Sequence, residues 1–358
     1  MKFVHLADMH FDIPFTSLNT REGLGEKRRL EQRNAFKKVI NYIKDNSIEY
    51  FFIAGDLYEH EYVKKSTIEF IINCFHEISN TKIFISPGNH DPYIKNSYYE
   101  TYDFGKNVYI FNKSTVEKYE DKNVNIYGLA FTEFYMENSP ILNIKPDDKT
   151  KLNILLTHCD LNGGKDVDGF SYNPILESKL NALEFDYIAI GHIHKNNVET
   201  AKKAYYPGSP ISLGFDELGK HGMIAGEINK DTFDIEFIPL DSREFKVIEV
   251  DVTKYDSREE LIENLLDINF ERKNMYKIVL TGYRNFEIDV RQLLKAVNIE
   301  NVLKIKDCTK ISYDIEELAK QNNLKGIFIR ETIKAYNSGL CTEEELQKAI
   351  EIGLDVMK

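Results

Sequence analysis

Histidine and acidic side chains recur in this chain directly after short apolar runs. One such run, residues 83–85, leads into a Pro-Gly turn that carries Asn89 and His90. An asparagine oxygen can bind a cation, and a histidine can bind a metal ion or transfer a proton near neutral pH. On composition alone, the segment 88–91 could equally be an ordinary turn. The decision depends on whether the same arrangement returns elsewhere.

Four other apolar runs end in the same way. They cover residues 3–7, 50–54, 152–157 and 187–190. The side chains that follow these runs are Asp8, His10, Asp56, His158, His192 and His194. The histidines outside this pattern are His5, His60, His76 and His221. Chance would rarely distribute histidines in this way, so the pattern favours one shared site over several separate core histidines.

The spacing between the runs predicts how that site forms. Helical periodicity over 26–46, with Leu30 among its apolar positions, and again over 68–78 separates the first three runs. The order β-α-β-α-β predicts a parallel sheet with right-handed crossovers. Ligands of such sheets bind beyond the carboxyl ends of the strands. We therefore expect the residues that follow the strands to converge, with His192 and His194 on one face of extended backbone.

These residue types indicate a particular chemistry. Aspartate, asparagine and histidine without a thiolate suit Mn²⁺, Fe²⁺ or Zn²⁺. The ligands are too many for one ion, and a carboxylate that bridges two ions about 3.5–4 Å apart would accommodate them. Such a pair suits in-line displacement at phosphorus. The sequence therefore predicts metal-dependent hydrolysis of phosphoesters.

The motifs D-x-H, G-D, G-N-H-D, H and G-H-x-H, in this order, resemble the signature of the calcineurin-like metallophosphoesterase superfamily. The segments 5–15, 54–58 and 206–210 are similar to SbcD/YhaO-type DNA-repair exonucleases, and 313–326 resembles the YhaO branch. The resemblance is close over the phosphoesterase domain and loose beyond it. It implies an α/β fold: a β-sandwich flanked by helices, a smaller α+β capping domain and a helical C-terminal tail.

The resemblance also implies how two divalent ions, with Mn²⁺ expected, would be shared out. The ligands of one ion would be Asp8, His10, Asp56 and His194. The ligands of the other would be Asp56, Asn89, His158 and His192. Asp56 would then be the bridge.

His90 matches the family's catalytic histidine, which stabilises charge on the phosphate or protonates the leaving oxygen. One position departs from the family pattern. Many nucleases of the family carry a histidine three residues after the bridging aspartate, where this chain has Glu59, followed by His60. Whether Glu59 or His60 takes over the positioning of the phosphate stays open.

Three parts are expected along the chain. Residues 1–240 would form the phosphoesterase (nuclease) domain, 242–310 a capping or DNA-binding domain, and 311–358 a helical tail. The elements expected in the second part are strands at 246–252, 276–281 and 302–305 and helices at 257–267 and 289–297.

The tail turns helical after Asp314. Its last helix begins with a capping box, Thr342 to Glu345, and continues with an apolar stripe. The stripe consists of Leu346, Ile350 and Leu354. It would either fill a groove of a partner or pack back on the second domain.

Composition is ordinary for a globular protein, with 42% hydrophobic and 29% charged residues in 358. The net charge of −12 argues against a surface coated with basic groups, although bound metal would neutralise several carboxylates. The basic residues at 27–29 with Arg33, Lys37 and Lys38 could line a local groove, but a solvated helix face is favoured.

Four cysteines without a C-x-x-C pair predict reduced thiols. Cys159 should point to the opposite face from its neighbour His158, away from the chemistry. No apolar run reaches the ~18 residues of a membrane span, and the polar start excludes a signal-peptide core. We therefore expect a cytoplasmic protein without a membrane partner.

The resulting interpretation is a two-metal DNA nuclease, expected to be an exonuclease in DNA repair, that acts with an SbcC-like coiled-coil ATPase. Two alternatives stay open: a scaffold subunit for such an ATPase with vestigial hydrolysis, and a phosphodiesterase for small molecules. The oligomeric state, with a homodimer among the options, and the choice between endo- and exonuclease action are not determined by these patterns.

Overall fold

The computed structural model describes residues 1–18, 23–313 and 315–357. These residues form two compact units, Met1–Lys246 and Val247–Lys358. The further division of the second unit at residue 311 stays a prediction. In the described parts of the chain, no helix combines the length and the apolar character that a membrane span requires.

A six-stranded sheet positions the first half of the site. Its strand order is β11-β10-β1-β2-β3-β4. The parallel strands are β1 (Lys2–Leu6), β2 (Tyr50–Ile53), β3 (Lys82–Ile85) and β4 (Val108–Ile110). The antiparallel strands at the other edge are β10 (Gly222–Ile228) and β11 (Phe233–Pro239).

A five-stranded sheet positions the second half. Its order is β5-β6-β7-β8-β9. The strands are β5 (Glu117–Glu120), β6 (Val124–Gly128), β7 (Leu152–His158), β8 (Tyr187–Gly191) and β9 (Ala204–Tyr205). All neighbours are parallel except β5 and β6.

The two sheets pack face to face. Because alternate residues of a strand share a face, Phe3 and Phe52 of one sheet enter the same core as Ile154 and Tyr187 of the other. The rings of Phe3 and Tyr187 lie 4.7 Å apart. This arrangement is a β-sandwich, and it confirms the predicted fold class.

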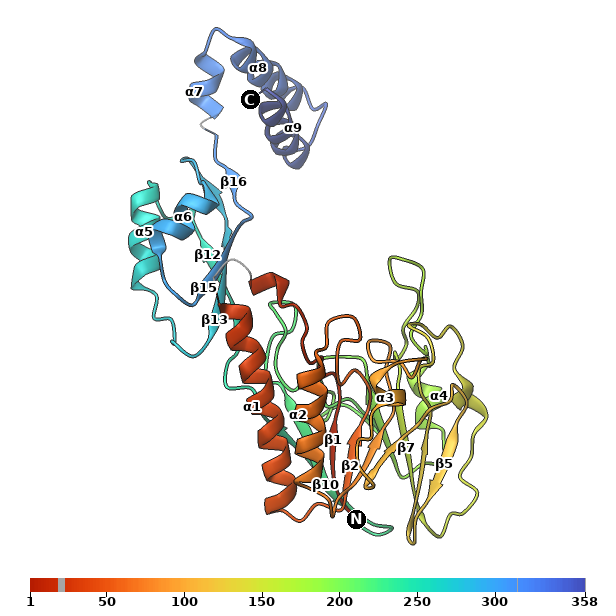
Figure 1. Cartoon of the computed structure of the whole chain (residues 1–358). Coiled ribbons are helices and arrows are strands. Elements are labelled where there is room, and N and C mark those ends of the chain that lie inside the picture. The colour runs from red at the N-terminus through yellow and green to blue at the C-terminus, as the bar shows by residue number, and fades with distance from the viewer. Residues whose placement is uncertain (19–22, 314, 358) are drawn as a thin grey trace. The chain divides into compact units, whose positions relative to one another are not determined.

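Helices cover the outer faces of the sandwich. Helices α1 (Leu24–Asp45) and α2 (Lys65–His76) run side by side along the six-stranded sheet (Figure 1). Phe51 points outward from β2, and its ring lies 6.4 Å from that of Phe75 in α2. The other outer face is covered by α4 (Glu177–Asn181) and a 3₁₀ turn (Pro140–Asn143). Short turns at Thr16–Leu18 and α3 (Tyr98–Thr101) complete the unit.

Two predictions for α1 are wrong. Leu30, placed in the apolar stripe, is 59% exposed. Arg28, placed on a solvated basic face, is fully buried. Its guanidinium forms an ion pair with Asp241, donates to the Ser212 carbonyl at 2.8 Å and lies 2.9 Å from Glu31. Helical periodicity cannot reveal that this arginine is buried, because the buried carboxylate that pairs with it, that of Asp241, is more than two hundred residues away.

Other members of that basic cluster also have partners within the chain. Arg33 donates to Thr67 at 2.6 Å, and Lys38 donates to the Leu240 carbonyl at 2.9 Å. Lys37 pairs with Glu77. The cluster therefore joins α1 to its neighbours.

The second unit contains a three-stranded sheet in the order β12-β13-β15. Its strands are β12 (Phe245–Asp251), β13 (Met275–Thr281) and β15 (Val302–Asp307). Two helices, α5 (Arg258–Asp267) and α6 (Val290–Val297), share its core. A two-stranded pair, β14 (Tyr283–Arg284) and β16 (Lys310–Ile311), accompanies them. All five elements predicted for 246–305 are present, with bounds within two residues of the prediction.

Three helices form the C-terminal part: α7 (Ile315–Lys320), α8 (Leu324–Asn337) and α9 (Glu343–Val356). The predicted start at Asp314 lies outside the described residues. The capping box is confirmed, since the Thr342 N–H donates to the Glu345 carboxylate at 2.8 Å and the Glu345 N–H donates to the Thr342 hydroxyl at 3.3 Å.

The apolar stripe of α9 packs within this group of helices. Ile350 and Leu354 are buried against Ile329 of α8, and Leu346 is partly buried beside them. Both expectations for the stripe, a partner's groove and the second domain, are therefore wrong. The sequence predicted the stripe, but it could not show that α8 presents the complementary face.

Candidate metal centre

The residues predicted to form the site follow five parallel strands. Asp8 and His10 come after β1, and Asp56 after β2. Asn89 and His90 follow β3. His158 is the last residue of β7, and His192 and His194 follow β8. Three groups of side chains have ligand atoms within 4.8 Å of one another: Asp8, His10 and His194; His10, Asp56 and His90; and Asp8, Asp56 and His158.

Asp56 lies at the middle of these groups. Its Oδ2 atom is 3.2 Å from His158 Nε2 and 3.6 Å from His10 Nε2. His158 Nε2 is in turn 3.0 Å from Asn89 Oδ1. One carboxylate therefore faces ligand atoms from both sheets, which is the place a bridging ligand requires.

Three imidazoles present the same nitrogen to the cluster. The Nδ1 atoms of His10 and His194 lie 2.7 Å from Glu59 and 2.5 Å from Glu217. His158 Nδ1 lies 2.8 Å from the Ala54 carbonyl oxygen. Because an ionised carboxylate and a carbonyl only accept, each Nδ1 donates and each Nε2 is directed inward.

This donor set fits divalent metal ions. His10 Nε2 and His194 Nε2 lie 3.1 Å apart. In the tautomer that carries its proton on Nδ1, the two Nε2 lone pairs face and repel each other. A cation between them would turn that repulsion into ligation. Metal-binding histidines characteristically donate their other nitrogen to a carboxylate or carbonyl, as these do.

The imidazole of His192 lies less close to the cluster than the side chains of the other predicted ligands. Its ring lies 5.1 Å from that of His158, and its backbone N–H donates to Asp8 Oδ1 at 3.0 Å. Its imidazole belongs to none of the three groups found among the described residues. The structure thus brings together Asp8, His10, Asp56, Asn89, His158 and His194, with the ring of His192 beside them.

His90 differs from its neighbours in exposure. Its side chain is 45% exposed, whereas that of His10 is 3% exposed. Its Nδ1 lies 3.0 Å from Glu59 Oε2, and its backbone N–H donates to Asp56 Oδ1 at 2.9 Å. Burial lowers the pKa of the His90 imidazole, but the charges of Asp56 and Glu59 outweigh it and raise the pKa to about 9. His90 is therefore the imidazole of this group most open to a substrate.

Burial and charge pairing also shift the pKa values of other side chains at the site. Burial raises the pKa of Glu59, but hydrogen bonds from His10 and His90 outweigh it and lower the pKa to about 2. Burial, followed by the nearby charge of His158, lowers the pKa of His192 to about 3. Glu59 is thus held ionised and the His192 imidazole neutral. The pKa of His158 is shifted the other way: burial lowers it, but the charges of Asp56 and Asp8 and a hydrogen bond with Asp56 outweigh burial and raise it to about 9, so a metal ion would displace a proton there.

The backbone carries conformational strain at this edge. Asp8, His10 and Asp56 have φ values of 52°, 47° and 54°, and His192 has 110°. Non-glycine residues rarely adopt such values, and clusters of them mark functional sites. Gly88 allows the turns to approach closely, because a Cβ there would lie 2.2 Å from Asp56 Oδ1.

Three supporting residues escaped the sequence reasoning. Asp91 accepts hydrogen bonds from the N–H groups of Leu57 and Gly88, both at 2.7 Å, and so joins the turns after β2 and β3. Gln32 of α1 donates to the His10 carbonyl at 3.0 Å. Asp91 belongs to the G-N-H-D motif and could have been found there. Glu217 and Gln32 gave no signal, because they act through contacts between remote segments.

Cys159 lies on the side predicted for it. It is buried in the outer core cluster of the five-stranded sheet, and burial raises the pKa of its thiol. A buried, protonated thiol is not a nucleophile.

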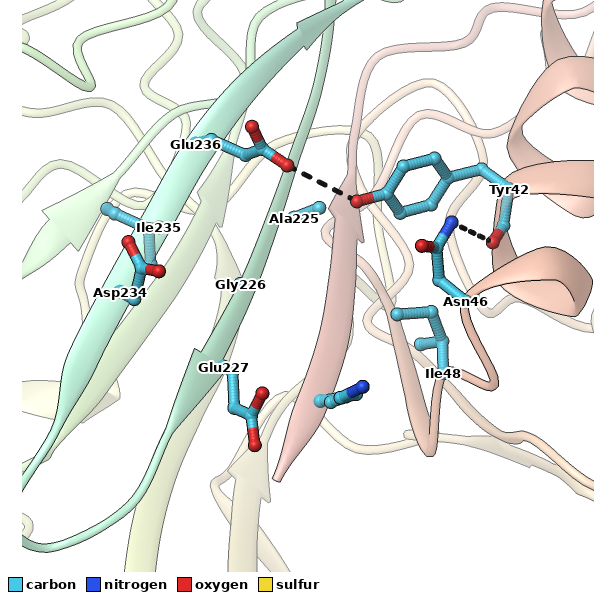
Figure 2. Close-up of a pocket in the computed structure, with 10 residues that line it drawn as sticks. Tyr42, Asn46, Ile48, Ala225, Gly226, Glu227, Asp234, Ile235 and Glu236 are labelled. Carbon is cyan, nitrogen blue, oxygen red and sulfur yellow. Dashed lines mark hydrogen bonds between the residues drawn. The ribbon is translucent and has the colours of Figure 1, made fainter.

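A separate pocket of about 270 Å³ opens between β10, β11, β1 and α1 (Figure 2). Lys2, the first residue of β1, lines it, so it lies at the opposite end of that strand from Asp8. The Tyr42 hydroxyl donates to Glu236 at 3.4 Å across it. None of the residues predicted to bind metal lines this pocket.

Comparison with known proteins agrees with this geometry. Residues 1–196 match the family model described as calcineurin-like phosphoesterase. The chain is similar to the DNA double-strand break repair protein Mre11 of Methanopyrus kandleri, with 23% identity over 392 residues that cover 100% of this chain and 82% of that protein. It is also similar to the uncharacterized metallophosphoesterase YhaO of Bacillus subtilis, with 22% identity over 264 residues. That alignment covers 71% of this chain and 64% of YhaO.

Proposed function

Because the chain belongs to the calcineurin-like phosphoesterase family, we propose that it is a two-metal phosphodiesterase that cleaves DNA, as an exonuclease in DNA repair. The observation that carries this proposal is the place of Asp56, whose carboxylate faces ligand atoms from both sheets. The similarity to a protein named for DNA double-strand break repair, over the whole chain, supports DNA as the substrate.

The proposed ligands divide between two ions. Asp8, His10, Asp56 and His194 would hold one, and Asp56, Asn89, His158 and His192 the other. We expect Mn²⁺, because a set rich in imidazole suits it better than Mg²⁺. When bound, the ions would supply Lewis acidity that activates water and offsets the negative charge of the phosphodiester.

The chain's own residues would do the remaining work. His90, exposed beside the centre, would donate a proton from Nε2 to the leaving oxygen as the phosphorus–oxygen bond breaks. Glu59 holds its other nitrogen. Asp91 keeps the turns that carry Asp56 and His90 in register through its hydrogen bonds to Leu57 and Gly88.

A partner ATPase of the SbcC-like coiled-coil type is part of the proposal. Exposed apolar side chains that such a partner would cover lie on α8, at Leu324 and Ile327, and in the turn that follows it, at Leu340. Deletion of 315–358 should leave hydrolysis of a small phosphodiester unchanged and abolish co-purification of the ATPase. Retained binding would locate the partner elsewhere. We further propose a cytoplasmic location for the protein.

Digestion of end-labelled linear DNA tests the function. Stripped protein loaded with Mn²⁺ should release labelled nucleotides, EDTA should stop the reaction, and Asp56→Asn should abolish it. Stepwise loss of label from an end supports exonuclease action, whereas internal fragments would identify an endonuclease.

A salt series separates DNA from a small substrate. Hydrolysis of the duplex should weaken steeply as salt rises, since DNA binding depends on counterion release. Hydrolysis of bis-p-nitrophenyl phosphate should stay flat. Equal efficiency on both, flat with salt, would favour a small-molecule phosphodiesterase. No hydrolysis of either by protein with both ions verified would favour a scaffold subunit.

A further inference from the structure

Glu59 contacts two imidazoles with one carboxylate. Its Oε1 lies 2.7 Å from His10 Nδ1, and its Oε2 lies 3.0 Å from His90 Nδ1. The residue is 7% exposed. It is fixed from both sides, because its own N–H donates to the Phe11 carbonyl at 3.1 Å and the next N–H, that of His60, donates to the His90 carbonyl at 2.9 Å.

This geometry ties the two rings together. An ionised carboxylate can only accept, so both Nδ1 atoms must donate, and both Nε2 atoms remain for other work. The two rings lie 4.8 Å apart with an angle of 82° between their planes. A movement of the Glu59 carboxylate toward one ring lengthens its hydrogen bond to the other.

We propose that Glu59 is a positioning residue shared between metal binding and proton transfer. It holds His10 with Nε2 toward the metal and His90 with Nε2 toward the substrate. The part that concerns His90 rests on the proposed function. Glu59 would thus have a role of its own at the position where many of the nucleases that this chain resembles carry a histidine.

His60 does not share this role. Its ring packs against that of Phe134, with centroids 5.8 Å apart, and its Nδ1 has no hydrogen-bond partner within the described part of the chain. Its backbone N–H alone joins it to His90.

Glu217 offers a matched control. Its Oε1 contacts a single imidazole, that of His194, at 2.5 Å, while Oε2 accepts from the Leu213 N–H at 2.8 Å. A glutamine side chain has one acceptor oxygen. A glutamine at position 217 can therefore keep the bond to its one histidine, although it loses the bond from the Leu213 N–H. A glutamine at position 59 can accept from only one of its two histidines.

Binding and spectroscopy come first, because neither needs turnover. Calorimetric titration with Mn²⁺ should show affinity reduced about 10–100-fold in Glu59→Gln, the range for loss of such a partner, and less in Glu217→Gln. In the Zn²⁺-loaded protein, nitrogen NMR should show at least one of the His10 and His90 Nδ1–H signals lost in Glu59→Gln, with both present in Glu217→Gln. Retention of both signals in Glu59→Gln would overturn the proposal.

A double-mutant cycle then tests the coupling. At saturating Mn²⁺, Glu59→Gln should lower kcat about 10²-fold in the wild-type background and little in a His90→Asn background, because the group it positions is already gone. Glu217→Gln should lower kcat by the same factor in the wild-type and the His90→Asn backgrounds. An equal loss of kcat on Glu59→Gln in the two backgrounds would overturn the shared role.

Glu59→Asp separates geometry from charge. It keeps the carboxylate but is one methylene too short to reach both rings, so it should show the same defects. Full activity in this variant would contradict the proposal.

Thermal unfolding midpoints near the wild-type value confirm that each variant is folded. If the wild-type protein hydrolyses neither DNA nor bis-p-nitrophenyl phosphate, the proposed function is wrong. The Mn²⁺ titration and the NMR signals would then still test whether Glu59 orients His10.

Discussion

Carboxylates that are not predicted to bind metal orient the imidazoles of this centre. Glu59 and Glu217 each hold a histidine by Nδ1 and leave Nε2 facing Asp8 and Asp56. The choice of tautomer is thus built into the protein before any ion arrives. Loss of such an outer partner typically costs about 10–100-fold in metal affinity.

We predict that His90→Asn keeps both metal ions and loses about 10²-fold or more in turnover, the usual scale for acid–base catalysis. The reason is that the proposed ligand sets are complete without it, while its ring is the exposed one. Elemental analysis and kcat measured on the same sample check this. Because His90 also lies in a group with His10 and Asp56, a missing ion would reassign it as a ligand.

We predict that Gly88→Ala weakens metal binding. The added Cβ would lie 2.2 Å from Asp56 Oδ1 and 2.9 Å from its backbone nitrogen, so the carboxylate must shift. Gly164→Ala is the control, since a Cβ there meets no atom within 4 Å. Mn²⁺ titration of both variants decides the matter, and equal affinities would refute the steric argument.

Residues of the centre that follow a strand could be predicted from the sequence, whereas contacts between segments far apart in the sequence could not. Asp8, His10, Asp56 and Asn89 could be predicted because each follows a buried strand, and parallel strands end at one edge. The bond from Glu217 to His194 could not, because it depends on how a loop folds back. The left-handed backbone at the site also has no sequence signature of its own.

At the scale of elements, strands with several consecutive apolar residues were easier to predict than strands in which polar residues interrupt such a run. β7 and β8 were predicted from their apolar runs, whereas β5 and β6 were not predicted, although every residue of β6 is buried. β6 contains a buried Asn125, whose side chain donates to Asn153 of β7 at 3.1 Å. A polar residue within a short strand masks the apolar pattern, and only the partner strand explains its burial.

We predict that Arg28→Met destabilises the protein by about 3–5 kcal/mol, because Asp241 would remain as a buried, uncompensated charge. Urea unfolding measures the loss. Lys27→Ala, exposed on the same turn, should change stability by less than about 0.5 kcal/mol. Adding Asp241→Asn to Arg28→Met should restore part of the stability, and failure to do so would point to lost packing instead.

We predict an acid-sensitive link between the sheets at Asp121. This residue, in the turn between β5 and β6, accepts from Tyr50 at 2.6 Å and pairs with Lys82. Burial raises its pKa, but the hydrogen bonds from Lys82 and Tyr50 outweigh it and lower the pKa to about 2.

A lowered carboxylate pKa stabilises the fold above the unfolded value, and this stabilisation is lost as pH falls through the folded value. Asp121 should therefore contribute fully above its ordinary value of 3.8 and lose its contribution toward pH 2. Unfolding midpoints across that window should fall less steeply in Asp121→Asn. Parallel curves for variant and wild type would exclude the link.

At the scale of the whole molecule, the net charge of −12 includes the carboxylates gathered for metal. We predict that stripped protein regains full hydrolysis with Mn²⁺ and only part of it with Mg²⁺, which prefers oxygen ligands and retained water. Rates after dialysis against a chelator and titration with each ion test this. Full activity in Mg²⁺ alone would contradict it.

The hydrogen bonds around Asp241 set how a pulling force would reach the centre. Its carboxylate pairs with Arg28 and accepts from the Ser212 N–H at 2.9 Å, shortly before the first unit ends at Lys246. The Ser212 hydroxyl donates to the Glu217 carbonyl at 2.8 Å, and Glu217 holds His194. A tension applied to the chain at Lys246 would therefore load the ion pair of Arg243 with Glu31 and then the buried pair of Asp241 with Arg28. Both pairs anchor the chain to α1, so Arg28 and Glu31 would take up part of this force before it reached His194, a proposed metal ligand.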